Sequence, residues 1–262
     1  YPDPGEGGEH ERKASGSGRG ERRTLRELRD ILDAFEAAQA AHPADDPRMI
    51  LVHSQMARAD QVARMKDLGV TPSFFSAHTW YWGDRHRDIF MGPERASSMS
   101  PAKWAQDNGV RFSSHLDTPV TPMLPLQAVW SMVHRISSSG DVIGPEHRIG
   151  VRDALRAVTI DAAWQVFKED EVGSLEPGKR ADLIQVAFDD VHHVPTYDVV
   201  SHLVFVTDEQ DVASVVVDGK ILMREQDMLT IDTERVSAEA TALGARIRSA
   251  LAERNSASKE SR

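Results

Sequence analysis

Residues 48–78 read RMILVHSQMARADQVARMKDLGVTPSFFSAH, and the order of apolar runs in this stretch decides the fold. Residues 48–53 form a short apolar run that is typical of a buried strand. Residues 59–68 follow as a helix-like segment that ends at Gly69, and residues 70–78 are a second short apolar run. A strand, a helix and a strand in this order predict an α/β protein with parallel strands.

The same alternation occurs elsewhere in the chain. A helix is predicted at residues 24–42, where large apolar residues recur mostly at steps of three or four, and Pro43 ends it. Beyond residue 100 the chain again alternates between helical and strand-like segments, at residues 101–108, 110–115, 125–136 and 150–167. Such alternation is typical of a parallel sheet or a (β/α) barrel, and we favour the barrel because polar residues follow the expected strands.

After residue 173 the pattern changes to turns and short apolar runs. Residues 212–222 are two such runs joined by Asp218-Gly219, a dipeptide favoured in type I′ hairpin turns. Residues 233–251 are rich in alanine and predict a terminal helix. We therefore expect a disordered tail, a partial barrel, a small β domain segment and a C-terminal helix with a loose end, at residues 1–23, 24–167, 168–232 and 233–262.

Composition narrows the class of function. The 262 residues carry 31 Lys plus Arg against 41 Asp plus Glu, a net charge of −10, which argues against nucleic acid as a partner. Because the chain has no cysteine, any metal site or acid–base chemistry must use His, Asp, Glu or Lys. We find no apolar run of about 18 residues and no signal-like start, so we expect no membrane partner and a cytoplasmic location.

Three expected strands end in a polar residue that could bind a metal or move a proton. These residues are His53 in LVHSQ, His78 in FFSAH and Asp117 in SSHLD. In a (β/α) barrel the side chains that carry chemistry project from the C-terminal ends of the strands, so the three could converge on one site. Each also has a structural interpretation, because a histidine at a strand end is often a packed core residue and an aspartate before Thr-Pro is often a turn or cap residue.

Four segments of the chain resemble a known family. The most specific is ALRAVTIDAAWQVFKEDEVGSLEPGKRADLI at residues 154–184, where a T-x-x-A-A-like pattern leads into G-S-x-x-x-G-x-x-A-D-L. The sequence is similar to the amidohydrolase superfamily, in the amidohydrolase-3 branch that contains N-substituted formamide deformylases and D-aminoacylase-like enzymes. The resemblance covers residues 28–229, and its other segments are DILDAFEAAQAAHPADDPRMILVHSQ (30–55), RMKDLGVTPSFFSAHTWYWGDRHRDIFMGPERA (64–96) and GVRFSSHLDTPVTPM (109–123).

The resemblance implies the C-terminal part of a TIM-like (β/α)8 metal-hydrolase barrel, with strands six to eight, plus a small β-sandwich domain. It implies a divalent metal, with zinc as the expected ion, that activates water to hydrolyse a carbon–nitrogen bond other than a peptide bond in a small molecule. Amide, formamide and deamination chemistry all remain open. By resemblance the metal ligands are His53 and Asp117, with Asp117 also the general base, and the expected substrate-binding residues are His78, Trp80, Asp84 and His115.

Other hypotheses stay open because several family ligands have no counterpart in this sequence. We find no H-x-H pair of a first barrel strand and no fourth- or fifth-strand ligand, and the chain opens with Tyr1 rather than Met. The chain could then be a catalytically incompetent fragment, or an interaction module whose strand edge pairs with a homo-oligomer partner or a missing N-terminal half. We interpret His86 as a loop residue and His192-His193 as structural residues of the β domain.

Overall fold

The structure, a computed structural model, describes residues 17–260 and divides into two compact units. Unit 1 extends to Ser174 and also includes Asp198–Phe205, whereas unit 2 comprises Leu175–Tyr197 and the chain from Val206 onward. The sequence predicts this boundary between residues 167 and 168. It does not predict that the later segment Asp198–Phe205 belongs to unit 1. Of the tail expected at residues 1–23, residues 1–16 lie outside the described residues. Residues 17–23 are helical.

The sheet of unit 1 has three parallel strands in the order β1-β2-β3. These strands are β1 (Met49–His53), β2 (Val70–Phe74) and β3 (Ser113–Ser114). All five residues of the central strand β2 are buried, as expected for a parallel strand that is covered on both faces. The expected alternation of strands and helices is therefore confirmed as a mixed α/β fold.

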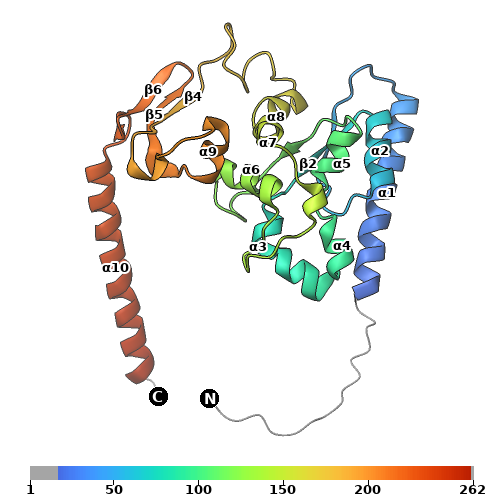
Figure 1. Cartoon of the computed structure of the whole chain (residues 1–262). Helices are drawn as coiled ribbons and strands as arrows, with labels where there is room; N and C mark the ends of the chain where they lie inside the picture. The colour runs from blue at the N-terminus through green and yellow to red at the C-terminus, as the bar shows by residue number, and fades with distance from the viewer. Residues whose placement is uncertain (1–16, 261–262) are drawn as a thin grey trace. The chain divides into compact units, whose positions relative to one another are not determined.

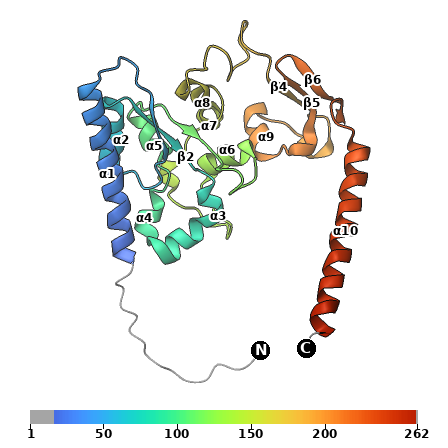
Figure 2. The ribbon, with the colours of Figure 1, turned by 180° about the vertical axis from the view of Figure 1, so that it is seen from behind.

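Helices surround this sheet, and Figures 1 and 2 show α1, α2 and α5 grouped on one flank of unit 1. The core is made of aliphatic and aromatic side chains from the sheet and from these helices, among them Leu32, Val62, Met65 and Phe74. The helical segments of unit 1 are α1 (Ser17–Ala41), α2 (Ala59–Asp67), α3 (His78–Arg85), the π-helical η1 (His86–Phe90), α4 (Pro93–Ser97), α5 (Ala102–Asp107), α6 (Pro125–His134), the 3-10 turn η2 (Pro145–His147), α7 (Val151–Ala157), α8 (Ile160–Gln165) and α9 (Val199–Phe205).

Three elements of unit 1 differ from the sequence-based prediction. The strand expected at residues 110–115 has only two residues that pair with β2. The helix expected at residues 150–167 is divided into α7 and α8, because Thr159 has an extended φ of −127° and a ψ of −101° that do not continue a helix. His78 does not end a strand; it is the first residue of α3, four positions after β2 ends.

Unit 2 contains one antiparallel sheet in the order β4-β5-β6-β7. Its segments are β4 (Leu183–Val186), the 3-10 turns η3 (Val191–His193) and η4 (Glu209–Asp211), β5 (Val212–Val217), β6 (Lys220–Arg224), β7 (Asp227–Met228) and α10 (Thr233–Glu260). Asp218 and Gly219 join β5 to β6 with φ values of 52° and 73°, which confirms the predicted type I′ turn. The described part of unit 2 has this single sheet, and the second sheet of the expected β-sandwich is not among these residues, so the sandwich stays a prediction.

Within residues 17–260, no helix has both the length and the apolar character needed to cross a bilayer.

Candidate active site

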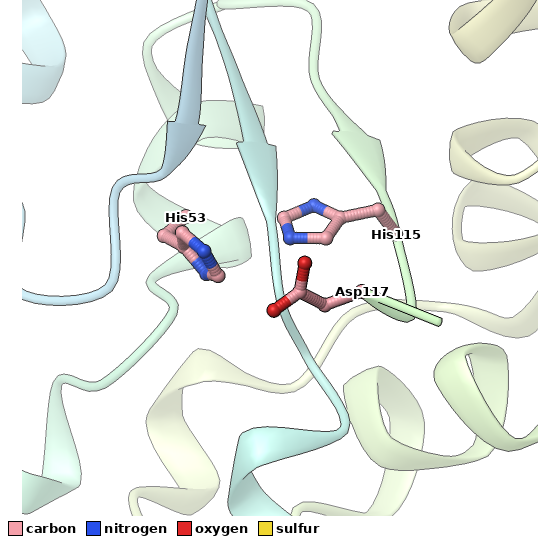
Figure 3. Close-up of side chains that lie close together, drawn as sticks. All are labelled: His53, His115 and Asp117. Carbon is pink, nitrogen blue, oxygen red and sulfur yellow. The ribbon is translucent and has the colours of Figure 1, made fainter. Parts of the chain in front are cut away.

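Side chains from two chain segments meet beyond the carboxyl ends of the parallel strands. His53 is the last residue of β1, while His115 and Asp117 follow β3, and Figure 3 shows all three directed toward the same space. One potential ligand atom of each residue lies within 4.8 Å of those of the other two. Two imidazoles and one carboxylate at this spacing form a donor set that suits a divalent metal ion.

Two of these residues have an unusual backbone conformation. His53 has a φ of 63° and Asp117 a φ of 54°, in the left-handed region that non-glycine residues seldom adopt. Local hydrogen bonds hold both turns: the Ser54 hydroxyl donates to the carbonyl of Leu51 at 2.9 Å, and the Val120 N–H donates to the carbonyl of Asp117 at 2.8 Å. Such conformations cluster at functional sites, where the surrounding structure maintains them.

His115 is oriented by the neighbouring strand. Its Nδ1 hydrogen-bonds with Oγ of Ser73 on β2 at 3.0 Å. Its Nε2 is buried and has no hydrogen-bond partner in the part of the chain that the structure describes. His115 therefore has one nitrogen fixed by the sheet and a second nitrogen available to a ligand, an arrangement common among metal-binding histidines.

The site is part of a larger cluster of buried histidines. The ring of His53 lies 4.9 Å from that of His115 and 5.9 Å from that of His78, and His86 lies 5.8 Å from His78. Phe75 packs against this cluster, with its ring 4.1 Å from that of His78. Besides His115 Nε2, the buried Nδ1 atoms of His53, His78 and His86 also have no hydrogen-bond partner among residues 17–260. Because an unpaired buried polar atom costs about 1–3 kcal/mol, four of them at one place point to a ligand that would pair them.

Burial keeps several of these imidazoles neutral. It lowers the pKa of His78 to about 3, and repulsion from His86, His53 and His115 contributes to this shift. Burial also lowers the pKa values of His86 and His115. Only a neutral imidazole can bind a metal or accept a hydrogen bond, so His78, His86 and His115 are in the protonation state that either role requires.

The interpretation of His86 as a loop residue is wrong. His86 is the first residue of η1, which continues α3 directly, and its Nε2 lies 3.2 Å from the side-chain nitrogen of Gln55. The amide nitrogen of Gln55 can only donate, so Nε2 of His86 accepts and Nδ1 carries the proton. Residues 78 and 86 are separated by about two helical turns, which places them on one face of the helix, and this spacing could have revealed His86 in the sequence.

The structure does not bring Trp80 and Asp84 to the cluster. Trp80 packs edge-on against Trp130, with 5.3 Å between the ring centroids. Asp84 accepts hydrogen bonds from the hydroxyls of Ser137 and Ser139, both at 2.7 Å, and thereby holds the turn that follows α6. Trp82 is the tryptophan that lines the site, since its ring lies 5.1 Å from that of His78.

Comparison with known proteins identifies the class. The sequence profile of the amidohydrolase family, Amidohydro_3, matches residues 23–223. This match spans well over half of the chain, so the chain belongs to the amidohydrolase family, and the resemblance found in the sequence is confirmed.

Curated relatives include a group of deaminases. The 5-methylthioadenosine/S-adenosylhomocysteine deaminase of Desulfitobacterium hafniense is 45% identical over 87 residues, which are 33% of this chain and 20% of that protein. The deaminase of the same name from Pelotomaculum thermopropionicum is 34% identical over 133 residues, which are 51% of this chain and 28% of that protein.

Solved structures give the same fold at lower identity. An adenosine deaminase from Xanthomonas campestris with bound zinc superposes with a TM-score of 0.58 at 20% identity, over 76% of this chain and 42% of that chain. Atrazine chlorohydrolase from Arthrobacter aurescens, complexed with zinc, superposes with a TM-score of 0.55 at 24% identity, over 74% and 40%. The chain thus spans between 20% and 42% of the length of these four relatives.

Proposed function

We propose that this chain provides part of the active site of a metal-dependent hydrolase that cleaves carbon–nitrogen bonds other than peptide bonds. The observation that carries the proposal is the convergence of His53, His115 and Asp117 beyond the carboxyl ends of parallel strands. This edge of a parallel sheet is where α/β proteins place their reacting groups. Family membership supports the same chemistry, because the curated relatives are named as deaminases.

The donor set fits zinc. Catalytic zinc sites use three protein ligands, drawn from histidine and carboxylate side chains, and leave a further position open to water or substrate. His53, His115 and Asp117 would hold the ion. Zinc bound there would lower the pKa of a water molecule and polarise the substrate bond that is to be cleaved.

The protein's own groups would handle the protons and the substrate. A carboxylate oxygen of Asp117 would take the proton from the attacking water and pass it to the leaving nitrogen, as a general base and then a general acid. The Nδ1–H of His86 is buried, points to no acceptor among the described residues, and would donate a hydrogen bond to a polar atom of the substrate. Neutral His78 would contribute a second polar contact beside Phe75 and Trp82.

The aromatic side chains favour a flat substrate. Trp82, which is partly exposed beside His78 and the buried Phe75, offers an aromatic surface against which a heterocycle could pack. Together with the names of the curated relatives, this favours hydrolysis of an exocyclic amine on a purine-like ring. Deformylation and deacylation of small amides are the competing reactions of the same class.

The sheet of unit 1 favours a larger assembly around the site. β1 is an edge strand, and its residue Val52 is 56% exposed although it is apolar. We propose that further strands continue the sheet at this edge and close a (β/α)8 barrel, with ligands that residues 17–260 do not supply. The second candidate, an interaction module that is inactive by itself, rests on the same exposed edge.

Zinc content and turnover test the proposal. The 262-residue chain and the polypeptide purified from its source are analysed for zinc and for ammonia release from adenine nucleosides, with release of formate from N-formyl amines as the second assay. Asp117→Asn is expected to lower kcat by about 10²–10⁴-fold, whereas Asp45→Asn, at an exposed position, is expected to leave it unchanged. Full turnover of the Asp117 variant would contradict the mechanism, and zinc without turnover in both preparations would favour the interaction module.

A further inference from the structure

A second group of metal-ligating side chains lies in unit 2, in the turns η3 and η4. Nε2 of His192 lies 3.0 Å from Oδ1 of Asp211, and Nε2 of His193 lies 3.2 Å from the same oxygen. His193 is fully buried and Asp211 nearly so, whereas the side chain of His192 is 40% exposed. The mechanism proposed above uses none of these residues.

These distances match those between ligands of one metal ion. Zinc–nitrogen and zinc–oxygen bonds of about 2.0–2.2 Å at tetrahedral angles place neighbouring ligand atoms roughly 3.3 Å apart. The two measured separations are within a few tenths of an ångström of that value. The exposed side of His192 leaves room for water as a further ligand.

The surrounding residues hold the ligand atoms in place. The backbone N–H of Asp208 donates to Oδ2 of Asp211 at 2.8 Å and so fixes the carboxylate, whose Oδ1 lies near both histidines and whose Oδ2 also lies 3.2 Å from Nε2 of His192. This hydrogen bond and those from the histidines lower the pKa of Asp211 to about 2, so its carboxylate is ionised. The ring of Phe188 packs 4.7 Å from that of His193.

A second carboxylate lies behind one of the histidines. Oδ2 of Asp190 is 3.9 Å from Nδ1 of His192, on the side of the ring away from Asp211. A carboxylate behind a histidine whose other nitrogen faces the metal is a recurrent arrangement that fixes ring orientation and increases the basicity of the ligand.

We propose that unit 2 binds a divalent transition-metal ion of the zinc class through Nε2 of His192, Nε2 of His193 and the carboxylate of Asp211. The ion stabilises the unit and takes no part in the reaction. The ligands bracket residues 194–208, the stretch that leaves unit 2 to supply α9 to unit 1 and then returns. A metal that joins η3 to η4 closes this stretch at its base, and its binding free energy adds to the stability of the folded unit.

A titration with zinc alone tests this site separately from the first one. The full 262-residue chain carrying His53→Gln and Asp117→Asn, which remove two ligands of the first site, is titrated with Zn²⁺ by calorimetry at pH 8. One equivalent is expected to bind, and His192→Gln in this background is expected to abolish binding or weaken it by about tenfold or more. His42→Gln, at an exposed histidine remote in sequence, is the matched control and should bind like the background protein.

Protection from hydrogen exchange and the chemical shifts of the histidine resonances give a second test of the site. Zinc is expected to slow hydrogen exchange of residues 187–211 in the background protein and not in the His192 variant. Should that variant fail to fold, zinc-dependent shifts of the His192 and His193 imidazole resonances in the background protein decide the question. Equal zinc binding in the His192 variant, or a background protein that binds no zinc, overturns the proposal and leaves a histidine–aspartate hydrogen-bond pair; neither result affects the first site.

Discussion

When no ligand is present, the unpaired nitrogens of the buried imidazoles in the candidate site lower the stability of the folded protein. His78 packs on Phe75 and has an Nδ1 atom that no other group in residues 17–260 satisfies. His78→Phe replaces the imidazole with a phenyl ring and thereby removes the unpaired Nδ1. We expect this variant to be more stable than the wild type by about 1 kcal/mol in urea unfolding with chelator present, and to lose turnover.

An exposed histidine gives the control for this prediction. His42→Phe changes the same atoms where water surrounds them, so its free energy of unfolding should stay within about 0.5 kcal/mol of the wild type. A His78→Phe variant that is destabilised would mean that the histidine already has a compensating partner, and the argument from unpaired nitrogens would then fail at this position.

His147 gives the stability of unit 1 a dependence on pH that does not involve the metal site. It is buried against Trp104, with ring centroids 4.5 Å apart, and burial together with repulsion from Arg135 lowers its pKa to about 4. In the unfolded chain the pKa returns to about 6.5, so between these values the unfolded state binds more protons than the folded state. Stability is therefore complete above about pH 6.5 and falls as the pH drops toward 4.

The comparison of wild type with His147→Gln isolates this effect. Between pH 7 and pH 5 the wild type is expected to lose about 2 kcal/mol more than the variant in urea unfolding, since the other histidines titrate equally in both proteins. His42→Gln should retain the wild-type pH dependence. Parallel pH profiles of wild type and His147→Gln would show that protonation of His147 is not linked to folding.

The C-terminal end of α6 is held by a single buried arginine. Arg135 has a φ of 55° and donates hydrogen bonds to the carbonyls of Ile143 and Met99 at 2.7 Å, and to those of Ser97 and Ser100 at 3.1 and 3.3 Å. It thereby joins α6 to the segment between α4 and α5, and that segment in turn contacts Gln55 next to His86. The guanidinium of Arg135 thus supplies hydrogen bonds to backbone carbonyls that no regular helix or strand would pair.

Replacement of this arginine should strongly destabilise the protein. Arg135→Met leaves buried carbonyls without donors, and we expect a loss of about 3 kcal/mol or more in urea unfolding. Arg152→Met, at an exposed position of α7, should change stability by about 0.5 kcal/mol at most. A small effect at Arg135 would indicate that water replaces the guanidinium.

The sequence predicts elements well where periodicity is strong, and poorly where pairing with residues distant in the sequence decides. β1, β2 and the Asp218-Gly219 hairpin follow from apolar runs and turn chemistry. β3 is shorter than expected because only Ser113 and Ser114 of the expected strand pair with β2, and apolar patterning does not encode where pairing with a neighbouring strand begins.

The candidate site was predictable only in part, for a related reason. His53 and Asp117 could be named because they follow expected strands. His86 escaped notice because a π-helical segment prolongs α3 beyond Gly83, where the sequence suggests a loop. The contacts of Asp84 could not be predicted, because its serine partners lie more than 50 positions further along the chain.

The two units differ in how much apolar surface they bury. Every buried apolar side chain of the described residues belongs to unit 1, and the fully or nearly fully buried residues of unit 2 are His193 and Asp211. Apolar residues of its sheet, including Ile184 and Ile221, are exposed. Hydrophobic burial is the main favourable term in folding, so unit 2 must depend on other interactions for its stability.

Unit 2 should therefore unfold before unit 1. In hydrogen exchange followed at increasing urea concentration, amides of β4, β5 and β6 are expected to lose protection at lower urea than those of β1 and β2, as separate cooperative units. Added zinc should raise the midpoint of the first transition and leave the second unchanged in the His53→Gln, Asp117→Asn background, because a ligand that binds only the folded state stabilises the unit that holds it. Simultaneous loss of protection in both sheets would instead mean that the two units unfold as one cooperative unit. The apolar residues exposed on the sheet of unit 2 would then have little effect on its stability.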